Sequence, residues 1–211
     1  MKRTLILAAV VASASTVPAQ AQTVEGEVAI VSQYLDDDMF KLSDGPVVQA
    51  GVYYYITDEC TLDAWGSKGI ENSVGDELDL GFWCAFAASD DVEISFGAYR
   101  YIVVDSPDFT DFSAALQIGN FDVTATYFIW DQNPDAFRVY GGYSIELTPA
   151  LTLRPAATYQ TGFGDPDIFA AGGTVSYGIN DNLSFEALVL TDVAGGNERG
   201  TRGSVGLKYS F

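Results

Sequence analysis

The stretch GSVGLKYSF, residues 203–211, alternates apolar and polar side chains up to the last residue of the chain. Such alternation is typical of a β-strand with one apolar face and one polar face. Chain ends normally fray, so a strand that continues to Phe211 needs a partner strand to hold it. A closed barrel supplies that partner, because it leaves no strand edge unpaired. The apolar set is Val205, Leu207, Tyr209 and Phe211.

The other end of the chain has the features of a secretory signal peptide. Lys2-Arg3 precedes a short apolar run at 5–12, and Ala19-Gln20-Ala21 offers a cleavage site. The run is too short to cross roughly 30 Å of hydrocarbon as a helix. We therefore expect residues 1–21 to be a signal peptide and residues 22–211 to form one exported domain.

The composition is strongly acidic and excludes binding to nucleic acid. The 211 residues include 10 basic and 29 acidic side chains, which gives a formal net charge of −19. Such a surface repels a phosphate backbone. Because 48% of the residues are hydrophobic and only 18% are charged, the chain is not an acidic disordered tail either. The acidic residues must therefore occupy specific places in a folded protein.

Alternation recurs over segments of about ten residues, separated by turn residues. The breaks between segments are alternately short and long along the chain. This pattern predicts an up-and-down antiparallel meander of about twelve strands, whose two ends face different environments. The segments start near residues 24, 47, 60, 76, 92, 110, 121, 137, 151, 169, 183 and 202. The short breaks are 57–59, 88–91, 119–120, 148–150 and 180–182, and the long ones are 35–46, 67–75, 104–108, 131–135, 161–167 and 193–201.

One apolar face per strand fits either a soluble sandwich or a membrane barrel. Three features favour the barrel. Charged residues recur in mid-strand on the polar parity, that is, at the alternate positions that carry polar side chains. The terminal strand accompanies a signal peptide, and aromatic residues gather near strand ends, as in the girdles at the two membrane interfaces of a barrel. The prediction is an all-β fold, a transmembrane antiparallel up-and-down β-barrel of about 12 strands in the bacterial outer membrane. The aromatic residues concerned are Tyr34, Tyr53 to Tyr55, Tyr127, Trp130, Tyr159 and Tyr177.

Four short pieces follow one another between residues 31 and 82: VSQY (31–34), SDGPVVQAGVYY (43–54), WGS (65–67) and ELDL (77–80). In these pieces the chain resembles the TorF-type porin family of Gram-negative bacteria. The family carries an Arg-Gly pair after its first strand, whereas this chain has acidic residues there, in YLDDDMFKLS (34–43). The resemblance implies an outer-membrane barrel of about twelve strands and little about its chemistry.

The polar parity predicts which residues line the interior. An excess of carboxylates there would favour cations through a narrow pore, and Tyr53 on the same parity would narrow it. We expect a porin-like channel for the passive diffusion of small solutes or ions, while a non-conducting barrel with a structural or surface-interaction role stays open as the alternative. The pore-lining candidates are Asp63, Trp65, Glu77, Asp79, Trp83, Arg138, Glu146, Arg154, Glu186 and Lys208.

Cys60 and Cys84 are the two cysteines of the chain. They fall on neighbouring predicted strands, and a symmetric hairpin places them opposite each other on the apolar parity. Directly opposed residues lie close enough for a disulfide, and an exported protein meets oxidising conditions. A disulfide and two reduced apolar thiols both remain open.

Enzymatic function is disfavoured by the absence of histidine. Without histidine, a Ser-His-Asp triad and a histidine-ligated zinc site are both excluded. We therefore assign no catalytic residue, metal or cofactor. The expected partners are outer-membrane lipid and lipopolysaccharide, the barrel-assembly machinery acting on the C-terminal strand, and small solutes or ions.

Overall fold

The computed structural model describes residues 24–35, 43, 45–71, 76–104, 106–131, 135–162, 167–194 and 200–211. These residues form β-strands and no helix, so none of them belongs to a helix able to cross a membrane. The expected signal peptide, residues 1–21, lies outside the described residues.

Apart from β9, the described strands begin within one residue of the predicted segments. Their bounds are β1 Val24–Val31, β2 Val47–Tyr55, β3 Cys60–Gly69, β4 Glu77–Ser89, β5 Val92–Val103, β6 Phe109–Ile118, β7 Phe121–Trp130, β8 Ala136–Tyr143, β9 Ile145–Thr148, β10 Leu151–Thr161, β11 Ile168–Gly178, β12 Leu183–Ala194 and β13 Thr201–Ser210.

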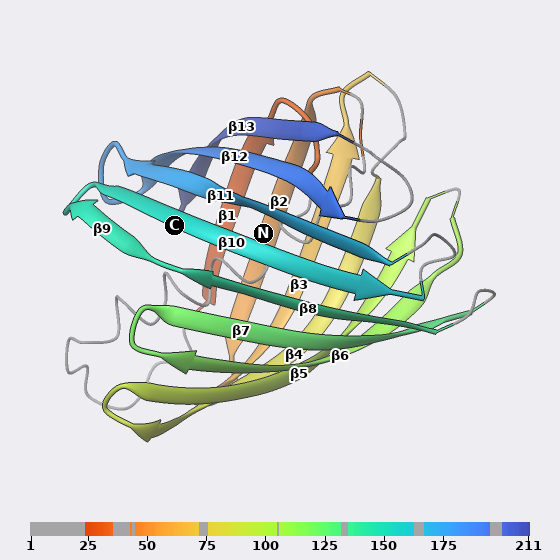
Figure 1. Cartoon of the computed structure of the whole chain (residues 1–211), viewed down its shortest axis with the longest axis horizontal. Helices are drawn as coiled ribbons and strands as arrows, with labels where there is room; N and C mark the ends of the chain where they lie inside the picture. Colours follow the sequence, from red (N-terminus) through yellow and green to blue (C-terminus); the bar gives the residue numbers. More distant parts are fainter. Residues whose placement is uncertain are drawn as a thin grey trace.

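The strands pair antiparallel in chain order, except that β8 and β9 both pair with β10 and not with each other, and the last strand pairs with the first (Figure 1). Val28 of β1 lies opposite Tyr209 of β13. Beyond β13, the backbone N–H of Gly26 donates to the carbonyl of Phe211 at 2.8 Å, and the N–H of Phe211 donates back at 2.9 Å. The predicted barrel is confirmed: it is closed, and its terminal strand is the closing strand.

The twelve-strand count holds because β8 and β9 occupy one position in the barrel. Both pair with β10, at Gly142↔Ala156 and Ile145↔Leu153, with a break at Ser144 between them. The N–H of Ser144 donates to the carbonyl of Asn120, in the turn between β6 and β7. The sequence pattern does not predict this interruption.

The two faces of the wall differ in polarity. Along β2, inward Val47, Gln49 and Gly51 are buried and alternate with exposed Val48 and Ala50. The exposed parity is apolar all around the barrel. A continuous apolar surface of this kind is not stable in water, whereas it suits a hydrocarbon environment. The buried parity therefore faces the interior, and the exposed parity is the membrane face.

The prediction of aromatic girdles is correct for some residues and wrong for others. Tyr127, Tyr159 and Tyr177 are exposed on the outer wall. Tyr34 and Tyr53 are buried instead, and their hydroxyls donate to carboxylates of the interior. An aromatic ring near a strand end suits a membrane interface or a lumen equally, so its position along the strand does not decide its side.

Candidate functional site

The inward parity places the predicted pore-lining residues in the interior of the barrel. Asp63, Trp65, Glu77, Asp79 and Trp83 stand on β3 and β4, and the basic Arg138 and Arg154 stand on β8 and β10. Glu186 of β12 and Lys208 of β13 are half-buried. Glu146 of β9 is exposed at the short-turn end, opposite Thr152.

Basic residues of the interior form ion pairs with carboxylates on nearby strands. The Arg154 guanidinium contacts Asp122 of β7 at 2.6 Å and also donates to the hydroxyl of Tyr140. Lys208 contacts Glu186 at 3.1 Å. Such pairs offset the cost of removing the charges from water. The other such pair is Arg202 with Asp192, at 2.7 Å.

Sequence reasoning missed several of these inward residues. Asp111, Asp122, Asp192 and Arg202 all stand on the inward parity of their strands. Their positions follow from the same alternation that placed Asp63 and Asp79, so the signal was present in the sequence.

Tyrosine hydroxyls donate to five of the inward carboxylates of β1 to β6. Each contact joins two different elements of the wall, since the hydroxyl comes from a strand or loop other than the one that carries its acceptor. A tyrosine hydroxyl is a neutral donor, so it adds no positive charge beside the carboxylate. The pairs are Tyr34–Glu77 at 2.5 Å, Tyr53–Glu27 at 2.9 Å, Tyr55–Glu25 at 2.9 Å, Tyr99–Asp63 at 2.7 Å and Tyr101–Asp111 at 2.8 Å.

The interior is divided into an acidic side and a side that carries the bases. Among the described residues, the inward side chains of β1 to β6 include carboxylates and no lysine or arginine. The inward bases stand on β8, β10 and β13. Carboxylates outnumber bases over the whole described interior, so its net charge is negative.

The start of the first long connection folds into the barrel. Tyr34 and Leu35 are both buried. The Tyr34 ring lies 5.6 Å from the Trp65 ring of β3, while Leu35 packs with Ile168 of β11 and Leu190 of β12. This segment therefore contacts both sides of the mouth and narrows it at the long-loop end.

Accessibility of the inward side chains falls from one end of the barrel to the other. Near the long loops, Trp65 and Gln160 are each 1% exposed and Asp79 is 0% exposed. Near the short turns, inward Glu25 is exposed and Glu93 is half-buried. The interior is therefore open at the short-turn end and closely packed at the long-loop end.

A disulfide joins Cys60 and Cys84. The two residues are direct partners on β3 and β4, with their Cα atoms 4.1 Å apart. They share the outward parity of Leu62 and Phe82, so the disulfide belongs to the outer wall near the short-turn end and is separate from the interior.

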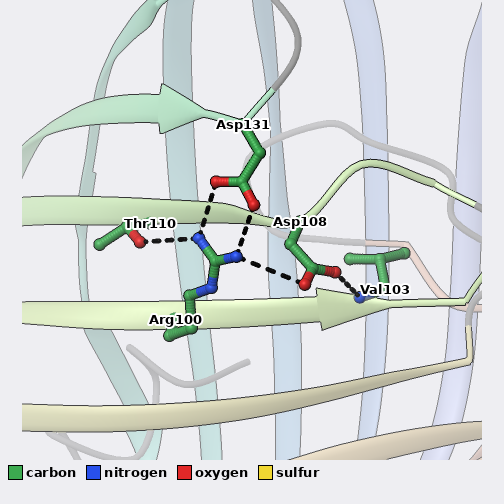
Figure 2. A network of polar contacts seen from close by, with 5 residues as sticks. All are labelled: Arg100, Val103, Asp108, Thr110 and Asp131. Atoms are coloured by element: carbon green, nitrogen blue, oxygen red, sulfur yellow. Dashed lines mark hydrogen bonds and ion pairs between the residues drawn. The ribbon is translucent and has the colours of Figure 1, made fainter.

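A second charged network lies at the long-loop end of the outer wall (Figure 2). Arg100 of β5 donates to both carboxylate oxygens of Asp131, at 3.0 and 2.7 Å, and to Asp108 at 3.3 Å. Its third acceptor is the hydroxyl of Thr110, and Asp108 also accepts from the Val103 N–H. The Arg100 guanidinium lowers the pKa of Asp131 below its usual value. The network ties the ends of β5, β6 and β7 together and contributes nothing to the lumen.

Solved membrane barrels share this architecture. The KdgM porin superimposes with a TM-score of 0.64 and 14% identity, covering 89% of this chain and 99% of the porin. The fold is that of outer-membrane porins and channels. An outer-membrane channel from Pseudomonas putida F1 gives a TM-score of 0.61 at 13% identity, over 92% of this chain and 96% of the channel. The NanC porin gives 0.58 at 9% identity, over 90% and 99%.

The sequence comparisons add no closer relationship. No family model matches the chain, and no curated protein matches it. At these low identities the likeness concerns the fold alone, and the resemblance of residues 31–82 to the TorF-type family stays a prediction.

Proposed function

We propose that this protein is a narrow, cation-preferring diffusion channel of the bacterial outer membrane. The observation that carries the proposal is the negative interior. In the part of the chain that the structure describes, the inward acids are Glu25, Glu27, Asp63, Glu77, Asp79, Glu93, Asp111, Asp122, Glu186 and Asp192, and the inward bases are Arg138, Arg154, Arg202 and Lys208.

Ion pairs within the described interior cannot neutralise all of its carboxylates, because the inward acids outnumber the inward bases. Arg154, Arg202 and Lys208 each contact an inward carboxylate directly. On β1 to β6, the inward carboxylates of Glu27, Glu25 and Asp63 accept hydrogen bonds from neutral tyrosines. The remaining negative potential raises the local concentration of cations and lowers that of anions.

Buried amides support a hydrated interior. Gln49 of β2 and Gln160 of β10 are each 1% exposed, and no protein group bonds their side-chain amides among the described residues. Burial of an amide without a hydrogen bond costs about 1–3 kcal/mol. Water in the interior would supply those bonds, since polar cavities in proteins hold ordered water.

The close packing at the long-loop end supports a small conductance. Tyr34 and Leu35 fold into the mouth, and Trp65 and Asp79 are almost wholly inaccessible. Ions and small solutes would pass such a constriction more readily than large sugars. The same packing is the observation that favours the second candidate, a non-conducting barrel with a structural or surface-interaction role.

The charge of the interior also argues against one class of solute. The KdgM porin has been solved with oligogalacturonate, a polyanion. In this chain, the carboxylates of β1 to β6 would repel a polyanion along half of the wall. We therefore place cations, and not acidic oligosaccharides, as the solutes of this channel.

The test removes inward negative charge without changing side-chain shape. We expect Glu25→Gln with Asp63→Asn to lower the ratio of cation to anion permeability about twofold or more, measured as the reversal potential in a KCl gradient. Asp131→Asn with Asp135→Asn is the matched control, because it removes the same charge from the rim outside the lumen. An unchanged reversal potential in the inward pair, with current still flowing, would overturn the assignment of these carboxylates to the pore.

A further inference from the structure

The inward face of β4 to β7 carries a continuous series of aromatic rings. The ring centroids of Trp83 and Tyr99 are 6.5 Å apart, and those of Tyr99 and Tyr101 are 6.3 Å apart. Tyr101 stacks on Phe109 at 4.2 Å, and Phe109 lies 4.3 Å from Trp130. We call these five residues the aromatic wall. It runs from the middle of the barrel to the long-loop end, and its upper members Tyr101, Phe109 and Trp130 are half-buried.

Two glycines let the first rings of the aromatic wall lie against the sheet. A Cβ at inward Gly97 would lie 2.3 Å from the Trp83 indole, and a Cβ at inward Gly81 would lie 2.1 Å from the Tyr99 ring. The rings therefore cover the space that side chains at these glycines would fill. Trp83 and Tyr99 are only 7% and 6% exposed, so Tyr101, Phe109 and Trp130 form the more accessible part of the aromatic wall.

Carboxylates stand beside the rings of the aromatic wall. The Tyr99 hydroxyl donates to Asp63 at 2.7 Å, and the Tyr101 hydroxyl donates to Asp111 at 2.8 Å. Rings and carboxylates of the aromatic wall therefore stand side by side at two successive positions. An aromatic face attracts an organic cation by its quadrupole, and a neighbouring carboxylate adds direct charge attraction.

The same interior already holds cations in this way. The Arg154 guanidinium lies 4.9 Å from the centroid of the Tyr140 ring and contacts Asp122. The Arg138 guanidinium lies 4.8 Å from the centroid of the Phe128 ring. Both are organic cations supplied by the chain itself, and they show that rings and carboxylates of this lumen suit such groups.

We propose that the aromatic wall binds organic cations that carry an alkylammonium group. The inference rests on the channel function proposed above, because a solute reaches the aromatic wall only through the interior. A neutral sugar would stack on the rings without using Asp63 or Asp111. An inorganic cation would use the carboxylates without needing the rings. The combination is matched by an alkylated ammonium solute.

The test is a binding measurement that does not require conduction. The full mature chain, refolded in detergent micelles, is titrated with tetramethylammonium chloride at constant ionic strength while tryptophan fluorescence is followed. Sodium chloride and glucose are the comparison solutes. We expect tetramethylammonium, and neither comparison solute, to quench the fluorescence in a saturable way. The apparent affinity of the Tyr99→Leu variant for tetramethylammonium should be about tenfold weaker than that of the wild type. Tyr99→Phe, which keeps the ring face, should bind as the wild type does.

Asp63→Asn completes the set of variants, and Tyr127→Leu is the matched control. Asp63→Asn should also weaken the binding, while Tyr127→Leu should not, because the Tyr127–Asp135 pair lies on the outer wall. Heat-resistant migration on gels verifies that each variant is folded. Equal responses to the three solutes, or equal affinity for Tyr99→Leu and Tyr99→Phe, would overturn the inference.

The channel function and the aromatic wall can fail separately. A cation-selective potassium current without tetramethylammonium binding would overturn the inference and leave the channel function standing. Saturable binding by a folded barrel that passes no current would support the aromatic wall as a binding site and overturn the channel function.

Discussion

At the scale of single residues, the interior is organised by pairs of neutral donors and carboxylates. The Tyr53 hydroxyl donates a hydrogen bond to Glu27, and the Tyr99 hydroxyl donates one to Asp63. The sequence indicated the inward side of Tyr53, because it shares the parity of the charged residues. It did not indicate the partners, because these depend on the stagger between neighbouring strands, which alternation within one strand does not specify.

The sequence also did not predict that Tyr34 and Leu35 fold into the interior. Both residues follow the end of β1, where the period-two pattern stops and no longer assigns a side. Their burial depends on contacts with Trp65, Ile168 and Leu190, which are distant in the chain and meet them only in the closed barrel.

The ion pair of Asp131 with Arg100 at the outer rim gives a prediction about how stability depends on pH. Arg100 lowers the pKa of Asp131 in the folded protein, so the pair stabilises the fold above the ordinary carboxyl pKa. That contribution is lost as pH falls through the lowered value. We expect Asp131→Asn to reduce the urea midpoint slightly at neutral pH and to match the wild type in strong acid. Asp91→Asn, at the short-turn end, is the control. A difference in urea midpoint between Asp131→Asn and the wild type that persists unchanged in strong acid would show that the Asp131–Arg100 ion pair is not its cause.

Gly97 gives a prediction about packing in the aromatic wall. A Cβ there would lie 2.3 Å from the Trp83 ring and 2.4 Å from the Phe82 carbonyl oxygen. We expect Gly97→Ala to lower the free energy of unfolding by about 1–3 kcal/mol and to shift the tryptophan emission of the folded state. At Gly178 the nearest atom is 3.9 Å away, so Gly178→Ala should change stability little. Equal stabilities of the two variants would show that Trp83 does not occupy this space.

At the scale of strands, the sequence predicted most of the fold. Alternation and turn residues are local signals, and they located the strand starts and the alternating short and long connections. The break at Ser144 was missed because the alternation continues through it. The Ser144 N–H continues the β7–β8 ladder to the Asn120 carbonyl. The break is on the other side, where the register places Pro155 of β10, which has no backbone N–H to donate, between Ala156↔Gly142 and Leu153↔Ile145.

The disulfide between β3 and β4 gives a prediction at this scale. It closes a chain segment with a sequence separation of 24 residues, and a cross-link of this length restricts the unfolded chain. We expect Cys60→Ala with Cys84→Ala to lower the free energy of unfolding by about 2–4 kcal/mol, measured by urea unfolding in micelles. Reduced wild-type protein should behave like the double variant. Identical stability of the oxidised wild type and the double variant would contradict this role.

At the scale of the whole molecule, closure of the barrel and the charge of its lumen are linked. Pairing of β13 with β1 removes the last free edge, so the polar parity is enclosed while the apolar parity covers the outside. Besides the loops, the acidic side chains then lie mainly in the interior. The sequence predicted this separation of polar and apolar faces. It did not predict the close packing of the interior at the long-loop end, which the structure shows.

The most direct test of the account is the zero-current potential of the refolded barrel, residues 22–211, in a planar bilayer across a KCl gradient. We predict small, discrete conductance steps and a potential with the sign set by potassium moving from the concentrated to the dilute side. A potential of the opposite sign would contradict an acidic conducting lumen. A folded, heat-resistant barrel that passes no current would contradict the channel itself and favour the non-conducting barrel.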